Sequence, residues 1–247
     1  MNRFLPSIAF AVLCAVPARA SEPITSCGTV IPPHKSGVLT ADLDCAAGPG
    51  VVLSDGAKLK LDGHRLSGSP DASNVVCNGT SACKIDGPGE IAGGYYAVTA
   101  GSVAGLKIRD VTVRDQLRGG LDGLASVRAR RLDMTNIGFG PDSPPGDTEI
   151  IRTGKLDASE LDAHDNDGTV SAVQYQVRRS SIVNNGGVGI GGGKGKLVKS
   201  TVTGNQGGPF LGPVDVLGSE PPKLIDTVCD HSYDADGTGT LGICQFD

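Results

Sequence analysis

The 247-residue sequence contains no tryptophan, and aromatic residues make up only 4% of it. Few side chains are therefore available for the ring stacking that many sugar-binding sites use. The sequence has no strict Gly-X-Y register, which excludes a collagen triple helix. Glycine itself is abundant, with 37 residues. Because each glycine inside a helix costs about 1 kcal/mol, a helical bundle is also excluded.

The sequence also lacks a long apolar stretch after its first twenty residues. Arg3 precedes the apolar residues 4–16, and Ala18-Arg19-Ala20 has the small-x-small pattern of a cleavage site. An apolar run this short cannot cross a bilayer core of about 30 Å. We therefore expect residues 1–20 to be a signal peptide, and the mature chain to be secreted, periplasmic or extracellular, with no membrane span.

The chain is acidic, with a formal net charge of −5. Loss of Arg3 and Arg19 with the signal peptide would take this charge to −7. An acidic chain is a poor candidate for general nucleic-acid binding, so no nucleic-acid partner is expected. Charged residues make up only 20% of the chain while Val, Ile and Leu recur regularly, which argues against disorder.

Six cysteines follow the predicted signal peptide, and none of them forms a Cys-x-x-Cys motif. An even number of cysteines in an exported protein indicates disulfides rather than a metal site. The spacing leaves their connectivity open. The simplest pairing is sequential and joins Cys27 with Cys45, Cys77 with Cys83, and Cys229 with Cys244.

The strongest signal is a repeat in which two apolar residues are separated by four others, as for Ile108 and Val113 or Val177 and Ile182. The first members of the copies fall at positions 61, 85, 108, 129, 158, 177, 197 and 224. Each copy predicts two short strands in which alternate side chains face inward. One copy cannot bury its apolar face alone, so the copies must stack into a solenoid.

The segments "VRRSSIVNN", "LVKSTVTGN" and "VVLSDGAKLKLDGHRLSG" resemble the right-handed parallel β-helix superfamily, which has the pectate-lyase-like fold, over roughly residues 50–230. This resemblance implies an all-β, right-handed parallel β-helix of about eight coils in a single domain. We expect an N-terminal cap region at 21–56, the β-helix at 57–230 and a C-terminal cap at 231–247. Disulfides 27–45 and 229–244 would tie down the two caps. The superfamily includes pectate and alginate lyases, polysaccharide hydrolases, uronate C5-epimerases, phage tailspikes and adhesins.

Stacking aligns equivalent positions of successive copies into columns. The first inward column should contain Ile108, Ala129, Ala158, Val177, Leu197 and Leu224. The second should contain Val113, Met134, Ala163, Ile182, Val202 and Cys229. The polar positions that follow are expected to form structural turn ladders, one of Asp115, Asn136, Asp165 and Asn184 and one of Asn166, Asn185 and Asn205.

The position before the first inward column is basic in six of eight copies. Its residues are Lys60, Lys84, Lys107, Arg128, Asp157, Gln176, Lys196 and Lys223. Such a stripe can simply solvate an exposed strand and discourage aggregation. Alternatively, it can bind an acidic polymer, with Lys60, Lys84, Lys107 and Arg128 as substrate-binding residues.

A second outward cluster contains Arg114, Asp133, Asp162 and His164. Asp133 and Asp162 could hold Ca²⁺ against a uronate carboxylate, while Arg114 or His164 removes the C5 proton. Loss of the 4-oxygen would make a lyase, and reprotonation from the other face an epimerase. Alternatively, the two carboxylates could act as a hydrolase pair, or the cluster could consist of ordinary salt bridges. The Pro/Gly-rich residues 137–150 could form a wall over this face.

Two function classes therefore remain. One is an enzyme acting on an acidic polysaccharide, and a uronate-polymer lyase or C5-epimerase is the leading hypothesis for it. The other is a non-catalytic carbohydrate-binding, adhesive or structural solenoid. The repeat is compatible with both classes, because a β-helix is a scaffold on which unrelated functions are built.

Overall fold

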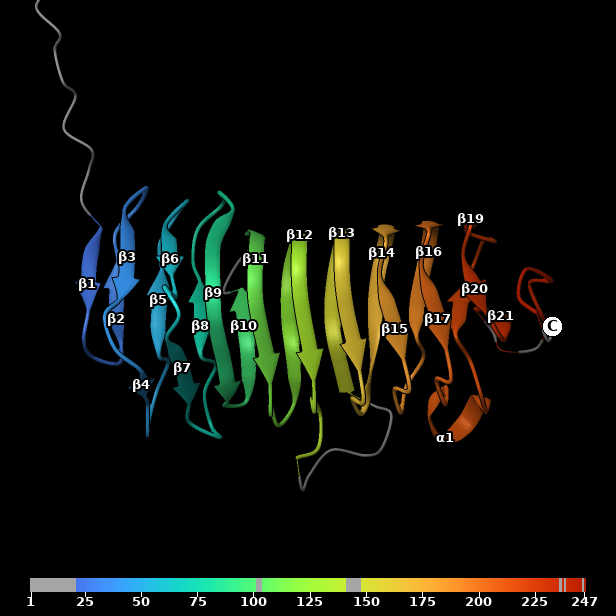
Figure 1. Cartoon of the computed structure of the whole chain (residues 1–247), viewed down its shortest axis with the longest axis horizontal. Helices are drawn as coiled ribbons and strands as arrows, with labels where there is room; N and C mark the ends of the chain where they lie inside the picture. The colour runs from blue at the N-terminus through green and yellow to red at the C-terminus, as the bar shows by residue number, and fades with distance from the viewer. Residues whose placement is uncertain (1–20, 101–103, 141–147, 236, 238, 246) are drawn as a thin grey trace, which may run out of the picture.

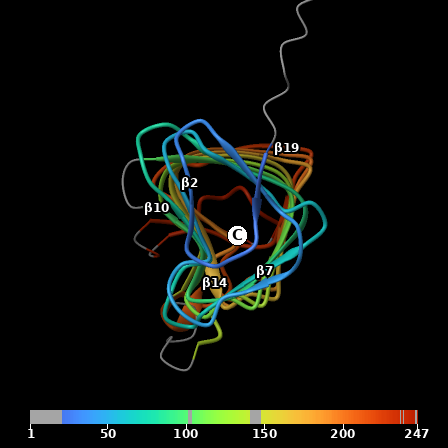
Figure 2. The same ribbon diagram turned by 90° about the vertical axis from the view of Figure 1, so that its left-hand side faces the viewer.

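The computed structural model describes residues 21–100, 104–140, 148–235, 237, 239–245 and 247. The predicted signal peptide lies outside these residues. The described chain forms a parallel β-solenoid of about eight turns, whose strands stand side by side along one long axis (Figure 1). Viewed along that axis, successive coils are superposed around a common centre (Figure 2).

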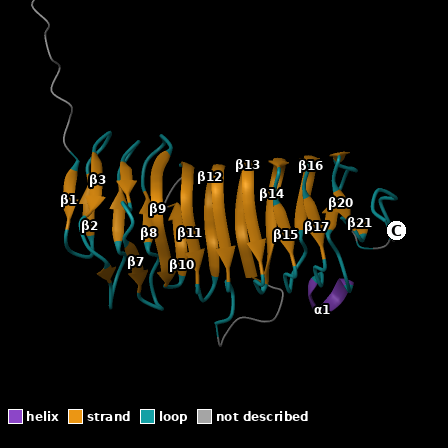
Figure 3. Cartoon of the chain, viewed as in Figure 1, coloured by secondary structure: helices purple, strands orange, loops and turns teal. Residues whose placement is uncertain are grey.

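Strands account for nearly all the regular structure of the described residues, and the only helix among them is the single turn α1 (Gly208–Leu211) (Figure 3). No described helix has the length and apolar character needed to cross a membrane. The strands are β1 (Glu22–Ile24), β2 (Thr29–Ile31), β3 (Ser36–Leu39), β4 (Leu43–Asp44), β5 (Val51–Leu53), β6 (Lys58–Lys60), β7 (Arg65–Gly68), β8 (Val75–Cys77), β9 (Cys83–Gly93), β10 (Tyr96–Ala100), β11 (Gly105–Arg114), β12 (Gly119–Thr135), β13 (Thr148–His164), β14 (Gly168–Arg178), β15 (Ser181–Val183), β16 (Ile190–Val198), β17 (Thr201–Thr203), β18 (Val216–Gly218), β19 (Lys223–Ile225), β20 (Val228–Cys229) and β21 (Ser232–Asp234).

The two predicted inward columns are confirmed from residue 85 onward. In the first, Ile108 pairs with Ile85 on one side and Ala129 on the other, and the pairing continues to Leu224. In the second, Val113 pairs with Met134, and the pairing continues to Cys229. Most members of both columns are fully buried. Alternation therefore places their apolar side chains in one continuous core.

The predicted register of the first copy is wrong by two residues. Leu59, and not Leu61, is the partner of Ile85. Both leucines are fully buried, so their alternation alone allows either choice. The turn that follows is longer here, because Asp62 and Gly63 both have positive φ, at 52° and 87°. Placing four residues between the two apolar positions, as in the other copies, therefore selects Leu61 instead of Leu59.

The parallel pairing begins earlier than the predicted cap boundary. β1 already pairs with β3, and β2 pairs with β5, so segment 21–56 is itself built from stacked strands. At the other end, β21 pairs with β18 within the predicted C-terminal cap. The two end disulfides, Cys27–Cys45 and Cys229–Cys244, are present as predicted.

The predicted third disulfide is not formed in the structure. Cys77, which ends β8, and Cys83, which begins β9, are buried free thiols. The neighbouring thiol of Cys83, together with burial, raises the pKa of Cys77. The Sγ atom of Cys83 lies 3.8 Å from the carbonyl oxygen of Leu53. Both thiols belong to the buried core of the solenoid.

The predicted polar ladders are confirmed as structural features of the turns. Asp115, Asn136, Asp165 and Asn184 have φ values of 58°, 53°, 53° and 56°, in the left-handed region that Asn and Asp tolerate. The next position is a buried amide ladder, in which Asn166 donates to Asn185, and Asn185 to Asn205, each at 2.9 Å. The ladder ends on the buried carboxylate of Asp215, at 2.8 Å from Asn205.

Candidate functional site

One outward column crosses the solenoid from β6 to β19 in continuous register. It contains Lys58, Lys84, Lys107, Arg128, Asp157, Gln176, Lys196 and Lys223. The column was predicted correctly except for its first member, where the structure places Lys58 instead of Lys60. This is the consequence of the two-residue shift at Leu59, since Lys60 pairs with Asp86 one column away.

A further column of outward side chains lies on each side of this one. On one side are Ser126, Lys155, Gln174 and Lys194. On the other are Lys60, Asp86, Arg109, Arg130, Ser159 and Arg178. We call the three columns together the basic face. They hold 12 of the 22 lysines and arginines of the sequence but only two acidic residues, on a chain whose net charge is −5.

The two acidic residues neutralise only four of the twelve cations. Asp86 pairs with Lys58 and with Arg109, the latter at 2.8 Å. Asp157 pairs with Arg178 at 2.7 Å and with Arg128 at 3.7 Å. The other eight cations of this face make no ion pair within the described chain, and they are Lys60, Lys84, Lys107, Arg130, Lys155, Lys194, Lys196 and Lys223.

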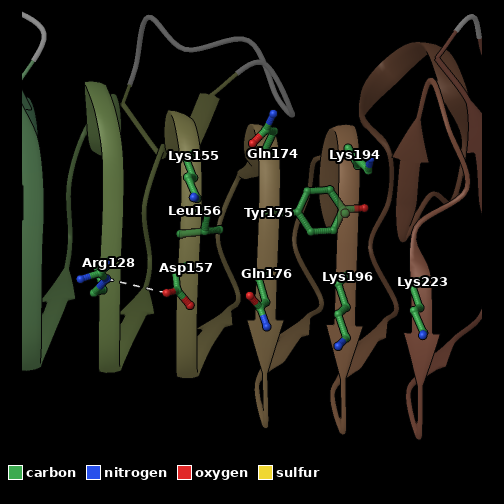
Figure 4. A pocket seen from close by; sticks show the side chains of 11 residues that line it. Arg128, Lys155, Leu156, Asp157, Gln174, Tyr175, Gln176, Lys194, Lys196 and Lys223 are labelled. Atoms are coloured by element: carbon green, nitrogen blue, oxygen red, sulfur yellow. Dashed lines mark ion pairs between the residues drawn. The ribbon is translucent and has the colours of Figure 1, made fainter.

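A shallow groove of about 560 Å³ runs over β13, β14 and β16 on the basic face. Figure 4 shows Lys155, Gln174 and Lys194 along one side of it and Gln176, Lys196 and Lys223 along the other. Parallel strands place these side chains in two rows because residues i and i+2 point to the same face. The groove thus lies between two rows of long polar side chains.

The floor of the groove is formed at Leu156, Tyr175 and Gly195, which occupy the inward position between the two rows. Tyr175 is only 5% exposed, and its ring lies against Gly195 of the next coil. A Cβ atom at Gly195 would stand 2.0 Å from the ring, so glycine is needed there. Burial raises the pKa of Tyr175. With the ring buried, the groove does not offer a stacking platform for a sugar.

The second predicted cluster is also assembled, on the C-terminal segments of strands whose preceding segments belong to the basic face. Asp133 on β12 is the register partner of Asp162 on β13, as predicted from the columns. One potential metal-ligand atom from each of Asp133, Asp162 and His164 lies within 4.8 Å of the other two. His164 Nε2 is 3.6 Å from Asp133 Oδ1, and His164 Nδ1 is 2.9 Å from the carboxylate of Asp165.

The electrostatics of this cluster favour a proton on the histidine. The hydrogen bond to Asp165 raises the pKa of His164, with Asp162 and Asp133 adding to the effect and burial opposing it. Burial raises the pKa of Asp133, and Asp162 adds to this, while His164 opposes it. Oδ1 of Asp133 is buried without a hydrogen bond. The cluster can therefore exchange a proton or hold a divalent cation. Ca²⁺ would use only the carboxylate oxygens, because imidazole suits ions such as Zn²⁺.

Arg114 is not free to act as the predicted base. Its guanidinium pairs with Glu90 at 2.8 Å and also with Asp115. These contacts, that to Glu90 foremost, raise the pKa of Arg114. Thr135 separates Arg114 from His164 in their shared column. Of the two candidate bases, the geometry favours His164.

The two predicted parts of the site lie on different segments of the same long strands, β11, β12 and β13, and do not share a groove. A residue with positive φ separates the two segments in each of these strands, at Asp110, Arg131 and Glu160. None of the three cluster residues lines the groove on the basic face. The predicted loop wall over the cluster falls largely on residues 141–147, which lie outside the described residues.

Several residues of the basic face were missed by the column prediction. They are Lys58, Arg109, Arg130, Lys155, Gln174 and Lys194. Most are two positions before or after a residue of the predicted stripe, and strand periodicity alone assigns such positions to the same face.

Comparison with protein families, with curated proteins and with solved structures finds no match for this chain. Its function is therefore inferred from its own residues.

Proposed function

We propose that this protein binds an acidic polysaccharide along the basic face, with the polymer running parallel to the solenoid axis. The observation that carries the proposal is the set of eight cations without ion pairs, which recur in register from β6 to β19. Successive coils place their cations about 4.8 Å apart. An extended polymer with an acidic group on successive sugars can therefore contact several cations at once.

The chemistry of the face favours a polysaccharide over a nucleic acid. Proteins that bind single strands combine cations with exposed aromatic rings on which bases stack. The groove contains one aromatic residue, Tyr175, and its ring is buried. The groove instead exposes the amide of Gln174 between Lys155 and Lys194 and the amide of Gln176 beside Lys196. Amides can hydrogen-bond to sugar hydroxyls.

The strength of binding is expected to come from the number of contacts. A single exposed ion pair contributes only about 0–1 kcal/mol. Several contacts made by one polymer reinforce one another, because each additional contact is intramolecular. Binding should therefore weaken steeply as salt rises, since exposed charges are screened over about 10 Å at 0.1 M.

The test measures binding of polygalacturonate, alginate and an unsulfated glycosaminoglycan by calorimetry or affinity electrophoresis. Lys84→Gln/Lys107→Gln should weaken binding up to about thirtyfold, if each of the two exposed contacts contributes up to about 1 kcal/mol. The matched control is Arg65→Gln/Arg152→Gln, which removes two positive charges elsewhere on the molecule. An equal effect of both variants, or no binding of any polymer by the unchanged protein, would contradict the proposal.

A second candidate function rests on the proximity of Asp133, Asp162 and His164. We propose that this cluster, if catalytic, serves a uronate lyase or C5-epimerase in which neutral His164 removes the C5 proton. A divalent cation held by the two carboxylates would offset the charge of the substrate carboxylate. Because its pKa is raised, His164 would be deprotonated only at more alkaline pH.

This second function has its own assay. Release of unsaturated uronate is followed by ultraviolet absorbance with and without Ca²⁺, and exchange of the C5 proton with deuterium by NMR. His164→Gln and Asp133→Asn should abolish either activity, while Lys84→Gln/Lys107→Gln should mainly raise KM. Release of new reducing ends without unsaturation would favour the hydrolase alternative. Absence of all three activities would leave binding as the function.

A further inference from the structure

One coil of the basic face differs from its neighbours. From β6 to β19, each of the remaining coils presents at least one cation without an ion pair. To the three columns of the basic face, β14 contributes Gln174, Gln176 and Arg178. Arg178 is held by Asp157 at 2.7 Å, so its charge is already balanced. Within the described chain, β14 is therefore the neutral coil of this face.

The neutral coil lies in the middle of the groove. Lys155 on β13 precedes it in one row, and Lys194 on β16 follows in the same row, with Lys196 beside it in the other. Neither Gln174 nor Gln176 makes a side-chain hydrogen bond within the described chain. Each amide offers two donors and an acceptor but no charge.

We infer that the groove selects a heteropolysaccharide in which a neutral sugar lies over Gln174 and Gln176 and acidic sugars lie on both sides of it, against Lys155 and against Lys194 and Lys196. This inference rests on the proposed binding function. A neutral sugar presents hydroxyl or acetamido groups, which the two amides can match with donors and acceptors. A third carboxylate at this position would meet no cation and would be desolvated against two neutral amides.

The inference predicts a preference for the ligand with fewer negative charges, which is the opposite of what net charge alone predicts and is therefore testable. If charge alone governed binding, a triuronate would bind better than a trisaccharide of uronate, neutral hexose and uronate. We expect the reverse, with the heterotrisaccharide about three to ten times tighter. The probes are these two trisaccharides, titrated at low salt while the side-chain amide signals of Gln174 and Gln176 are followed by NMR.

Two variants make the experiment decisive. Gln174→Lys/Gln176→Lys should invert the preference by giving the neutral coil two cations. The control, Thr201→Lys/Thr203→Lys, adds the same charge to outward positions of β17, outside the basic face, and should leave the order of the two ligands unchanged. Both pairs of positions are at least partly exposed, so both variants should fold.

The outcomes separate this inference from the function on which it rests. Three results would overturn the inference alone, provided that long polymers still bind and that their binding depends on Lys84 and Lys107. The triuronate could bind more tightly than the heterotrisaccharide, or the preference for the heterotrisaccharide could persist in Gln174→Lys/Gln176→Lys. The third result is that the heterotrisaccharide leaves the NMR signals of the two side-chain amides unshifted. If long polymers fail to bind as well, the proposed function fails first.

Discussion

The basic face and the face that contains Asp133 lie on successive segments of the same coils, separated by a residue with positive φ, yet their charges are arranged in opposite ways. On the basic face, Lys84 and Lys107 are register partners, and neither makes an ion pair within the described chain. On the other face, Arg114 lies between two carboxylates and His164 contacts Asp165 and Asp133. Charges paired within the protein serve mainly structure, whereas repeated charges left unpaired favour a ligand of opposite charge.

The turn between the two faces follows the structural pattern. Arg131 pairs with Asp110 and Glu160, and Glu160 pairs with Arg179 at 3.1 Å. Opposite charges thus alternate from coil to coil at this corner. Such alternation is absent from the segment that precedes this corner in each coil, which belongs to the basic face.

The largest effect should come from the buried amide ladder, which follows the Asp133 face and holds the coils in register. Asn185→Leu removes the hydrogen bonds to Asn166, Asn205 and the carbonyl of Ala163. Because each buried polar group left unsatisfied costs about 1–3 kcal/mol, we expect a loss of about 3 kcal/mol or more in unfolding free energy. Denaturant titration measures it.

The exposed Asn136→Ser provides the control for this ladder, because it changes an amide in the neighbouring turn column without touching the buried one. Its effect on stability should be well below that of Asn185→Leu. Similar losses for the two variants would show that the buried ladder has no special role in fixing the register of the faces.

Reversal of one charge on the basic face should separate stability from binding. Lys107→Glu places an acid between Lys84 and Arg128, its partners in the adjacent coils. Since like charges on neighbouring strands are unfavourable by roughly 0.2–1 kcal/mol, the variant should unfold at a slightly higher temperature. Its affinity for an acidic polymer should fall about tenfold. Thermal unfolding tests the expected stabilisation, and a binding titration at the same salt concentration tests the expected loss of affinity. A destabilised variant with unchanged affinity would contradict the difference proposed between the two faces.

Removal of a charge on the other face should have the opposite effect on stability. Arg114→Gln leaves Glu90 and Asp115 without their shared cation. Because Arg114 is more than a third exposed, solvent screening limits the expected loss to about 0.5–1 kcal/mol. The loss should be largest at low salt and should shrink in 1 M NaCl. An increase in melting temperature would mean that this face, too, carries excess positive charge.

The smallest effect concerns pH. The pKa of His164 is raised in the folded protein, chiefly by Asp165. The protonated imidazole therefore stabilises the fold below the unfolded value of about 6.5, and this contribution is lost as pH rises through the folded pKa. The melting-temperature difference between the unchanged protein and His164→Gln should be greatest near pH 5–6 and should decrease above neutral pH. NMR titration of the imidazole checks the same shift, and a pKa below 6.5 would contradict it.

The periodicity of the sequence was sufficient to predict the columns over most of the chain. Ile108, Ala129 and Ala158 were placed in one inward column although two of them are only alanines, because polar residues alternate with them. The same periodicity failed at Leu59 and Leu61. In "KLKL" both leucines are compatible with burial, and the length of the following turn decides which one meets Ile85.

Sequence alone determined that this chain is a stack of short strands, that its turns carry Asn and Asp, and that one outward column is basic, because all three follow from local alternation and from the conformations that residue types tolerate. Only the tertiary structure decided which charges remain unpaired, since Asp157 meets Arg178 and Asp86 meets Arg109 across coils about twenty residues apart in the chain. It also decided that Cys77 and Cys83 remain thiols and that Gln174 and Gln176 line a groove with lysines before and after them. These contacts depend on the register between coils, and the longer turn between Leu59 and Leu66 shows that turn length decides which residues pair.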